Sequence, residues 1–295
     1  MTTKTITSFD GATISYRQLG QGPGLIIIHG GLETWRSHRD LAELLSSTFT
    51  VYVPDRRGRG LSSPPGPDYG MQTEVADIET LSRETGARFG FGVSSGALIL
   101  LQTCLLRRGV FDRAAIYEPP LLLVDRGRFN PLYERFRGEV ARDDIASALI
   151  TGMKITGLGP PVLPSLPYWL LRPLINWFVS RQESNGQAGG ADEDAEPILR
   201  DLVPTMVCDF RLVEEMEGTL ESFRKLRDTR VRLMSGTASV SYCIHSCEEL
   251  EKVIPGVTNT RMHGLTHLGA GNRDVEGKPE VVAEVLRDFF TQLES

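Results

Sequence analysis

The sequence predicts an α/β fold, in which buried strands alternate with helices around a mostly parallel sheet. Three observations carry this prediction. The apolar run Leu25–Ile28 has the composition of a buried parallel strand. The pattern Gly-Val-Ser-Ser-Gly at 92–96 stands between a short strand expected at Arg88–Phe91 and a helix expected at Ala97–Arg108. Near the end of the chain, a short strand expected at Thr260–His263 leads into a glycine-bounded loop.

The pentapeptide at 92–96 predicts a serine nucleophile on a tight strand-to-helix turn. Its outer glycines, Gly92 and Gly96, let neighbouring backbone approach Ser94 while that residue is held in a strained conformation. The following helix points its N-terminal N–H groups toward the serine, so the same turn supplies part of an oxyanion site. Five residues with two glycines also match by chance, and the motif alone leaves its function open.

Two further segments follow expected strands upstream of this motif. His29–Gly31 comes directly after the run at 25–28, where glycines allow a backbone N–H to face a ligand. A simple turn is the alternative interpretation. The segment 55–62, Asp-Arg-Arg-Gly-Arg-Gly-Leu-Ser, follows the strand-like residues Thr50–Val53. It predicts a hydrogen-bonded, charged turn, and we assign it no chemistry.

The general base is sought among five histidines: His29, His38, His245, His263 and His267. His267 lies on the glycine-bounded loop 264–269, whereas His263 belongs to the end of the expected last strand. A histidine on a loop after the last strand is well placed to act as a general base. We therefore favour His267.

In this order, these segments and Tyr117–Pro120 resemble the α/β-hydrolases over nearly the whole chain. The resemblance implies the α/β-hydrolase fold and the serine hydrolase branch of the superfamily. Matched position by position, Ser94 corresponds to the nucleophile and His267 to the base. The backbone N–H groups of Ser95 and Gly31 correspond to the oxyanion donors. The resemblance says much less about substrate, because one fold hosts many chemistries.

The acid of the triad departs from the common family pattern. Many members place an aspartate just after the strand expected here at Val231–Met234, but Ser239 stands there and carries no charge. Glu118 ends the expected strand Arg113–Tyr117 at the sheet edge where ligands bind, and it keeps the order Ser–acid–His. Some haloalkane dehalogenases and the zearalenone lactonases place their acid similarly. The alternatives are a turn-capping Glu118, an incomplete triad, or Asp209 as the acid.

The organisation expected for the chain is one core interrupted by an insertion. The core comprises residues 1–120 and 205–295, and it opens with a hairpin over Thr5–Leu19. Residues 121–204 depart from the strand–helix alternation and predict a mainly helical cap. Within the cap, the polar and glycine-rich stretch 184–194 predicts a mobile loop.

The cap is expected to shape the substrate site. The segment Leu166–Phe178 holds two of the three tryptophans, and its apolar residues predict contact with the roof of the core. Most apolar residues of this segment are expected to pack within the cap, and a few to line an apolar pocket. Trp169, Trp177 and, after Gly31, Leu32 are the candidate substrate contacts. Ligand sites are mostly apolar, so we expect a moderately bulky, apolar, uncharged ester or lactone as the substrate.

Composition limits the partners. The net charge of −6 and the pI of about 5.5 argue against nucleic acid, which favours a basic face. The apolar runs fall short of the roughly 18 residues that a membrane span needs, and the chain opens on polar residues, so a cytoplasmic protein is expected. A small-molecule substrate is the expected partner. The oligomeric state stays open, with a homodimer among the possibilities.

The four cysteines, Cys104, Cys208, Cys243 and Cys247, lack the spacing of a zinc site. On a helix, Cys243 and Cys247 share a face while His245 points away. We expect neither a metal nor another cofactor.

These features favour a serine hydrolase that cleaves an ester or lactone through an acyl-enzyme. Two readings of other classes remain open. A non-hydrolytic enzyme, such as a C–C lyase or cyclase, would use the same pocket and His267. A ligand-binding protein would keep a hydrolase-like pocket with little turnover. The missing aspartate at Ser239 favours this alternative, whereas the presence of Ser94 and His267 opposes it.

Overall fold

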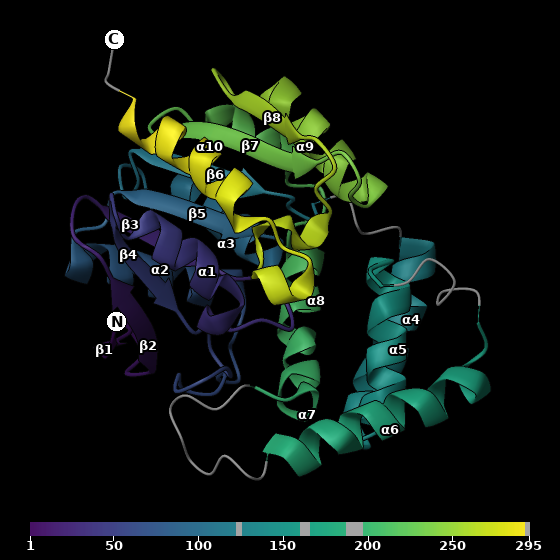
Figure 1. Cartoon of the computed structure of the whole chain (residues 1–295). Coiled ribbons are helices and arrows are strands. Elements are labelled where there is room, and N and C mark those ends of the chain that lie inside the picture. The colour runs from purple at the N-terminus through teal and green to yellow at the C-terminus, as the bar shows by residue number, and fades with distance from the viewer. Residues whose placement is uncertain (122–125, 160–165, 187–196, 293–295) are drawn as a thin grey trace.

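The computed structural model describes residues 1–121, 126–159, 166–186 and 197–292 (Figure 1). Its centre is an eight-stranded sheet with the order β1-β2-β4-β3-β5-β6-β7-β8. The pairs β1–β2 and β2–β4 are antiparallel, and the other neighbouring pairs are parallel. The predicted α/β class and the mostly parallel sheet are confirmed.

The strands are β1 (Thr2–Thr7), β2 (Thr13–Leu19), β3 (Gly24–Ile28), β4 (Thr50–Pro54), β5 (Phe89–Val93), β6 (Arg113–Tyr117), β7 (Arg230–Gly236) and β8 (Thr258–Met262). The helices are α1 (Arg39–Leu45), α2 (Met71–Thr85), α3 (Ser95–Leu106), α4 (Arg126–Ala141), α5 (Ile145–Thr156), α6 (Tyr168–Gly186), α7 (Leu199–Leu202), α8 (Met206–Glu215), α9 (Ser241–Val253) and α10 (Pro279–Thr291). The predicted N-terminal hairpin is present as β1 and β2.

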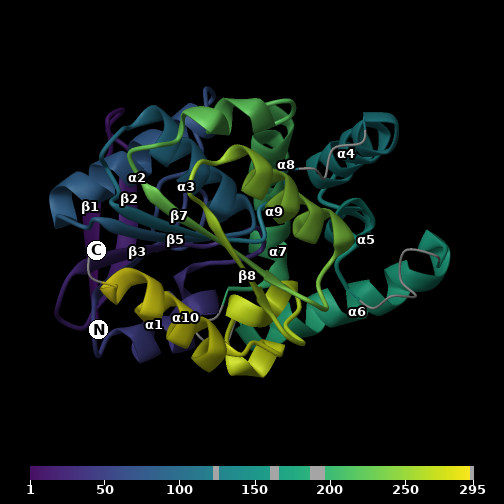
Figure 2. The ribbon, with the colours of Figure 1, turned by 90° about the horizontal axis from the view of Figure 1, so that it is seen from above.

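The sheet is covered on both faces, because its inner strands are apolar on both sides. Leu25 and Ile27 of β3 pack with α1 and α10 on one face, whereas Ile26 and Ile28 pack with α2, α3 and α9 on the other. This alternation is what a strand geometry with successive side chains on opposite faces produces. Figure 2 shows the resulting three layers. The packed layers fix the carboxyl ends of β5, β6 and β7 along one edge.

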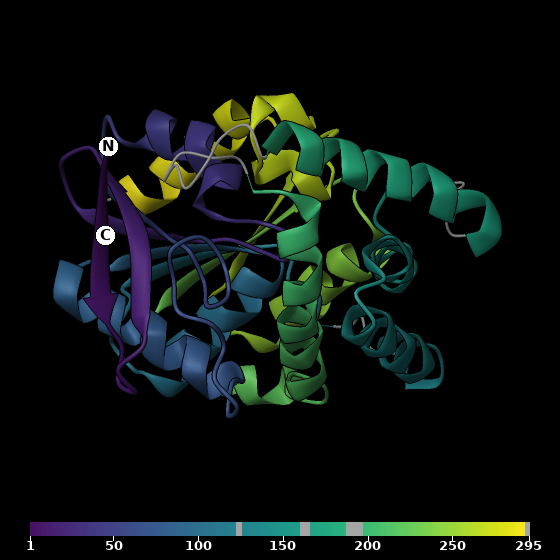
Figure 3. The same cartoon turned by 90° about the horizontal axis from the view of Figure 1, so that it is seen from below.

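Helices α4 to α7 follow β6 and stand beside this edge, at the side of the molecule opposite the N-terminal hairpin (Figures 1 and 3). We call them the inserted helices. Helix α8 stands between them and the sheet, and Phe210 on α8 packs with Phe129 and Phe136 of α4. The inserted helices fall within the segment 121–204. The division of the chain into two domains at those boundaries stays a prediction.

Helix α6 corrects the expectation for the tryptophans. Its packed stripe repeats every four residues, with Leu171 and Val179 buried and Ile175 partly buried, and the helix packs on α5 and α7. Trp169 and Trp177 lie on its other side and are 76% and 57% exposed. For the two tryptophans, the expected contact with the roof of the core is therefore wrong, because they lie on the exposed side of the helix.

The first three residues of the loop expected at 184–194 are helical instead. Ser184, Asn185 and Gly186 still belong to α6. The remainder of that stretch, from residue 187 on, lies outside the described residues. Among the residues that the structure describes, helices long and apolar enough to cross a membrane are absent.

Candidate active site

Ser94 occupies the strained turn that the motif predicts. Strand β5 ends at Val93 and α3 begins at Ser95, and Ser94 between them has φ 53° and ψ −122°. Its N–H donates to Tyr117 O of the neighbouring strand at 2.9 Å. A Cβ on Gly96 would collide with the backbone of β3, so glycine is required where this turn approaches the sheet. Residues outside the favoured backbone regions concentrate at functional sites.

Glu118 and His267 lie together at the same edge of the sheet. His267 Nδ1 is 2.6 Å from Glu118 Oε2, and both side chains are buried. Glu118 also accepts hydrogen bonds from Gly236 N at 2.7 Å and from Ser239 Oγ at 2.5 Å. With Nδ1 donating to the carboxylate, Nε2 is the nitrogen of His267 left to accept a proton. Ser239, which stands where an aspartate was expected, thus supports the carboxylate instead of replacing it.

The backbone brings the three residues to the same edge of the sheet. Glu118 N donates to Met234 O, so Glu118 continues the parallel pairing of β6 with β7 before its own φ of 51° turns the chain. Tyr117 Oη donates to Thr266 O at 2.7 Å and holds the loop that carries His267. Ser94 is half-buried, and its hydroxyl has no hydrogen-bond partner among the described residues. Hydrogen bonds between a nucleophile and its base often tighten when substrate binds.

The loop after β3 lies against the candidate nucleophile. A Cβ on Gly30 would be 3.0 Å from Ser94 Cβ, so Gly30 passes close to the turn. Burial, and then the charges of Arg59 and Arg56, hold the pKa of His29 well below its ordinary value, so this imidazole is neutral. Its Nδ1 donates to Gly30 O at 2.9 Å, and its Nε2 accepts from Arg56 N at 3.1 Å. These bonds fix the loop that presents the N–H of Gly31.

A second carboxylate, Glu33, was missed by sequence reasoning. Gly30 N donates to Glu33 Oε2 at 2.6 Å, and His38 Nε2 lies 3.2 Å from the same oxygen. His38 Nδ1 in turn donates to Ala270 O at 3.0 Å. Burial acts to raise the pKa of Glu33, but the charge of His38 outweighs it and lowers that pKa, while Glu33 raises the pKa of His38. An ion pair thus anchors the loop beside Ser94. The local sequence around Glu33 does not predict this pairing.

The His38–Glu33 pair predicts a pH-dependent contribution to stability. Because the pKa of folded His38 is raised, its contribution is fully present below about pH 6.5 and is lost as pH rises through the folded-state pKa. The pKa of Glu33 is lowered, so its contribution is fully present above about pH 4.3 and is lost as pH falls through the folded-state pKa. His38→Gln should therefore lower Tm by about 3 °C or more near pH 5.5, and by less near pH 9. Thermal unfolding at both pH values measures the difference.

The exposed His245 provides the matched control, because it pairs with Glu248 at the surface. His245→Gln should change Tm little at either pH. An equal loss of Tm in His38→Gln at pH 5.5 and at pH 9 would contradict a charged His38.

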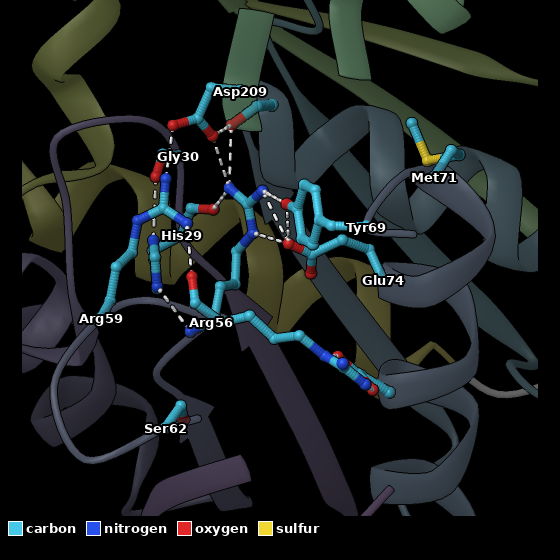
Figure 4. A network of polar contacts seen from close by, with 12 residues as sticks. His29, Gly30, Arg56, Arg59, Ser62, Tyr69, Met71, Glu74 and Asp209 are labelled. Carbon is cyan, nitrogen blue, oxygen red and sulfur yellow. Dashed lines mark hydrogen bonds and ion pairs between the residues drawn. The ribbon is translucent and has the colours of Figure 1, made fainter. Parts of the chain in front are cut away.

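The arginines of the segment 55–62 are buried rather than solvated. Arg56 and Arg59 each retain 2% exposure, and both pair with Asp209 of α8 (Figure 4). Arg56 also pairs with Glu74 of α2 at 2.9 Å. Asp209, the rival candidate for the acid, is thus held by two arginines, and the carboxylate within reach of His267 is that of Glu118. The charged turn was predicted, but its burial was not.

The candidate substrate contacts are separated by the fold. Leu32 follows Gly31, has φ 58°, and packs against the apolar cluster formed by α4, α5 and α8. Trp169 and Trp177 lie on the exposed side of α6. Leu32 therefore borders the site, whereas the two tryptophans face away from the apolar cluster beside it.

One group of metal-ligand type occurs among the described residues. Donor atoms of Glu118, Cys243 and His267 lie within 4.8 Å of one another. His267 Nδ1 is already bonded to Glu118, and burial holds the pKa of the Cys243 thiol well above its ordinary value, so the thiol stays protonated. Cys243 and Cys247 are buried on one face of α9 while His245 is exposed. This arrangement suits packing of the thiols.

A three-layer fold with a strained serine after β5 and a carboxylate-bound histidine at the same sheet edge defines an α/β-hydrolase type of site. Residues 25–256 match the alpha/beta hydrolase family, and the chain belongs to that family.

The relatives are hydrolases of several kinds. The chain is 28% identical over 217 residues to epoxide hydrolase 3 of Siraitia grosvenorii, covering 61% of this chain and 68% of that protein. It is 28% identical over 213 residues to pyrrolizixenacetamide deacetylase of Xenorhabdus hominickii, covering 66% of this chain and 76% of that protein. An alpha/beta hydrolase from Sphaerobacter thermophilus superposes with a TM-score of 0.76 and 27% identity over 98% of this chain and 100% of that one. These similarities support hydrolase activity and leave the bond cleaved open.

Proposed function

We propose that the protein is a serine hydrolase that cleaves an apolar, uncharged carboxylic ester or lactone through an acyl-enzyme. The observation that carries the proposal is the Glu118–His267 pair, at 2.6 Å, beside the strained turn that holds Ser94. The three groups follow the Ser–acid–His order of a serine triad, and this order supports giving them the roles of nucleophile, acid and base.

In this mechanism, Ser94 Oγ attacks the acyl carbon while His267 Nε2 takes its proton. The negative charge that develops on the carbonyl oxygen is stabilised by the N–H groups of Ser95 and Gly31. Glu118 stabilises the imidazolium, which then gives the proton to the departing alkoxide. Water attacks the acyl-enzyme with His267 as base, and the carboxylic acid leaves with Ser94 restored.

An acyl carbon suits this nucleophile better than an epoxide. Ring opening by Ser94 would leave an ether on the enzyme, and water does not readily cleave an ether. An ester formed on Ser94 is instead hydrolysed by the same histidine that formed it. The serine at this turn therefore favours acyl transfer, and the relative named as a deacetylase acts on an acyl group by name.

The surroundings of the site favour an apolar substrate. Leu32 adjoins a cluster of aromatic residues on the inserted helices and α8 that includes Phe129, Tyr133, Phe136 and Phe210. The Glu33 carboxylate near Ser94 is paired with His38, so this pair adds no net positive charge that would attract an anionic acyl group. Both features support an uncharged ester or lactone with a moderately bulky apolar part.

A fluorophosphonate probe and a substrate panel test the proposal. Wild-type protein should become covalently labelled on Ser94, as intact-protein and peptide mass spectrometry would show. It should also turn over uncharged chromogenic esters and aliphatic or aromatic lactones faster than their carboxylate-bearing analogues. Labelling without turnover of any ester or lactone would favour a non-hydrolytic enzyme. Neither labelling nor turnover, in a protein that still binds apolar ligands, would favour a ligand-binding protein.

A further inference from the structure

Figure 4 draws a buried charged cluster that the mechanism does not use. Its Asp209 lies beside Ser95 and Gly31, the residues expected to supply the oxyanion donors. The cluster joins segments that are distant in the sequence: Arg56 and Arg59 after β4, Tyr69 just before α2, Glu74 in the first turn of α2, and Asp209 on α8. Tyr69 Oη donates to Glu74, and Arg56 Nη2 donates to Tyr69 Oη at 3.2 Å. The two arginines belong to the segment 55–62, which was predicted only to form a charged turn.

One carboxylate of the cluster contacts both residues that would supply the oxyanion donors. Ser95 Oγ donates to Asp209 Oδ1 at 2.8 Å. A Cβ on Gly31 would lie 3.2 Å from Asp209 Oδ2, so the other carboxylate oxygen packs against the Gly31 backbone. Gly31 follows β3 and Ser95 opens α3, and Asp209 spans the two.

The charge of Asp209 is held in place and neutralised. Burial acts to raise its pKa, but the charges of Arg59 and Arg56 outweigh burial and hold that pKa below its ordinary value, so the carboxylate is ionised. Arg56 Nη1 lies 2.8 Å from Asp209 Oδ1 and also donates to Ser95 Oγ at 3.0 Å. An unpaired carboxylate here would oppose a developing oxyanion, and the two guanidinium groups offset it.

We propose that Asp209 is a positioning residue that sets the spacing of the two oxyanion donors. Because Asp209 stands on α8, which follows the inserted helices directly, the same contact ties the oxyanion hole to that part of the chain. The inference rests on the proposed serine hydrolase function. Displaced donors cost transition-state stabilisation, whereas a purely structural ion cluster would affect only folding stability.

The first test removes the link without touching the backbone donor. Ser95→Ala keeps its N–H but deletes the hydroxyl that bonds Asp209. We expect kcat for a neutral ester to fall about tenfold and KM to change less than about twofold. Removing an oxyanion donor lowers kcat by about 10²–10³-fold, and displacing a donor lowers kcat by less. The inhibition constant of a trifluoromethyl ketone, whose Ser94 adduct carries an oxyanion, should rise about tenfold in parallel.

The matched control is Ser82→Ala on α2, which also deletes a buried serine hydroxyl with one hydrogen bond, to Ala87 O. It should leave kcat and the inhibition constant unchanged. A Ser95→Ala variant that loses Tm as Ser82→Ala does, with kcat and the inhibition constant unchanged, would overturn the proposal.

A double-mutant cycle with Asp209→Asn separates positioning from folding. If Asp209 acts through Ser95, then Ser95→Ala should have a smaller effect on kcat in the Asp209→Asn background than in the wild type. Effects that multiply independently would overturn the proposal. Should Asp209→Asn fail to fold, the Ser95→Ala measurements decide the matter alone. Wild-type protein that neither hydrolyses esters nor binds the ketone would instead refute the proposed function, and with it this role for Asp209.

Discussion

Ser94→Ala is expected to reduce hydrolysis of a neutral ester by about a thousandfold or more. The variant retains the fold but deletes the oxygen that would form the acyl-enzyme, and losses of this size follow removal of the nucleophile from serine triads. Steady-state kcat/KM on one chromogenic ester measures the effect. Covalent labelling by a fluorophosphonate should disappear in the same variant. Relief of backbone strain at a position with φ 53° is not expected, because alanine must adopt the same turn.

Ser95→Ala is the control beside it in the sequence. Only its backbone N–H and its contact with Asp209 are proposed to serve the reaction, so a loss of about tenfold is expected. If Ser95→Ala abolished hydrolysis while Ser94→Ala retained it, the nucleophile would have been assigned to the wrong serine.

Glu118→Gln should lower kcat by about a hundredfold or more. The amide nearly preserves the shape of the side chain and can still accept the hydrogen bond from Gly236 N, but it carries no charge to stabilise the His267 imidazolium. An amide can also donate to Nδ1, which favours the wrong histidine tautomer. Single-turnover and steady-state kinetics on the same ester would show the loss mainly in kcat.

Ser239→Ala tests whether the effect belongs to the carboxylate or to its surroundings. It removes one hydrogen bond to Glu118 Oε2 but leaves the charge and the bond to His267. We expect a loss of less than about tenfold. Near-normal kcat in Glu118→Gln, with an unchanged far-ultraviolet circular dichroism spectrum, would remove Glu118 from the triad.

Most of the sheet could be predicted because its strands are recognisable from their local sequence. Leu25–Ile28 and Arg113–Tyr117 are short apolar runs bounded by glycine, proline or charge, and both strands form where predicted. The start of α3 was predicted two residues too late. Glycine disfavours helix interiors, yet Gly96 lies in the first turn of α3 because any side chain there would strike β3. A tertiary contact overrides the local preference.

The site divides in the same way. Ser94, Glu118 and His267 were found because each follows a recognisable strand, and parallel strands bring their carboxyl ends to one edge. The Glu33–His38 pair and the contact of Asp209 with Ser95 depend on segments brought together only by the fold. The exposed tryptophans were misplaced for the opposite reason. The first part of helix α6, residues 168–179, carries apolar residues on its exposed side as well as on its buried side, so its sequence does not show which side is buried.

The position of the acid after β6 has a consequence for the order in which the site assembles. Ser94 and Glu118 belong to one β5–α3–β6 crossover, and Ser94 N is already bonded to the residue before Glu118. His267 joins them from 149 residues further along the chain. Contacts between neighbouring segments close small loops and form sooner than distant ones. The nucleophile and the acid are therefore expected to reach their positions early in folding. The site becomes able to catalyse the reaction only when the C-terminal segment with His267 packs against them.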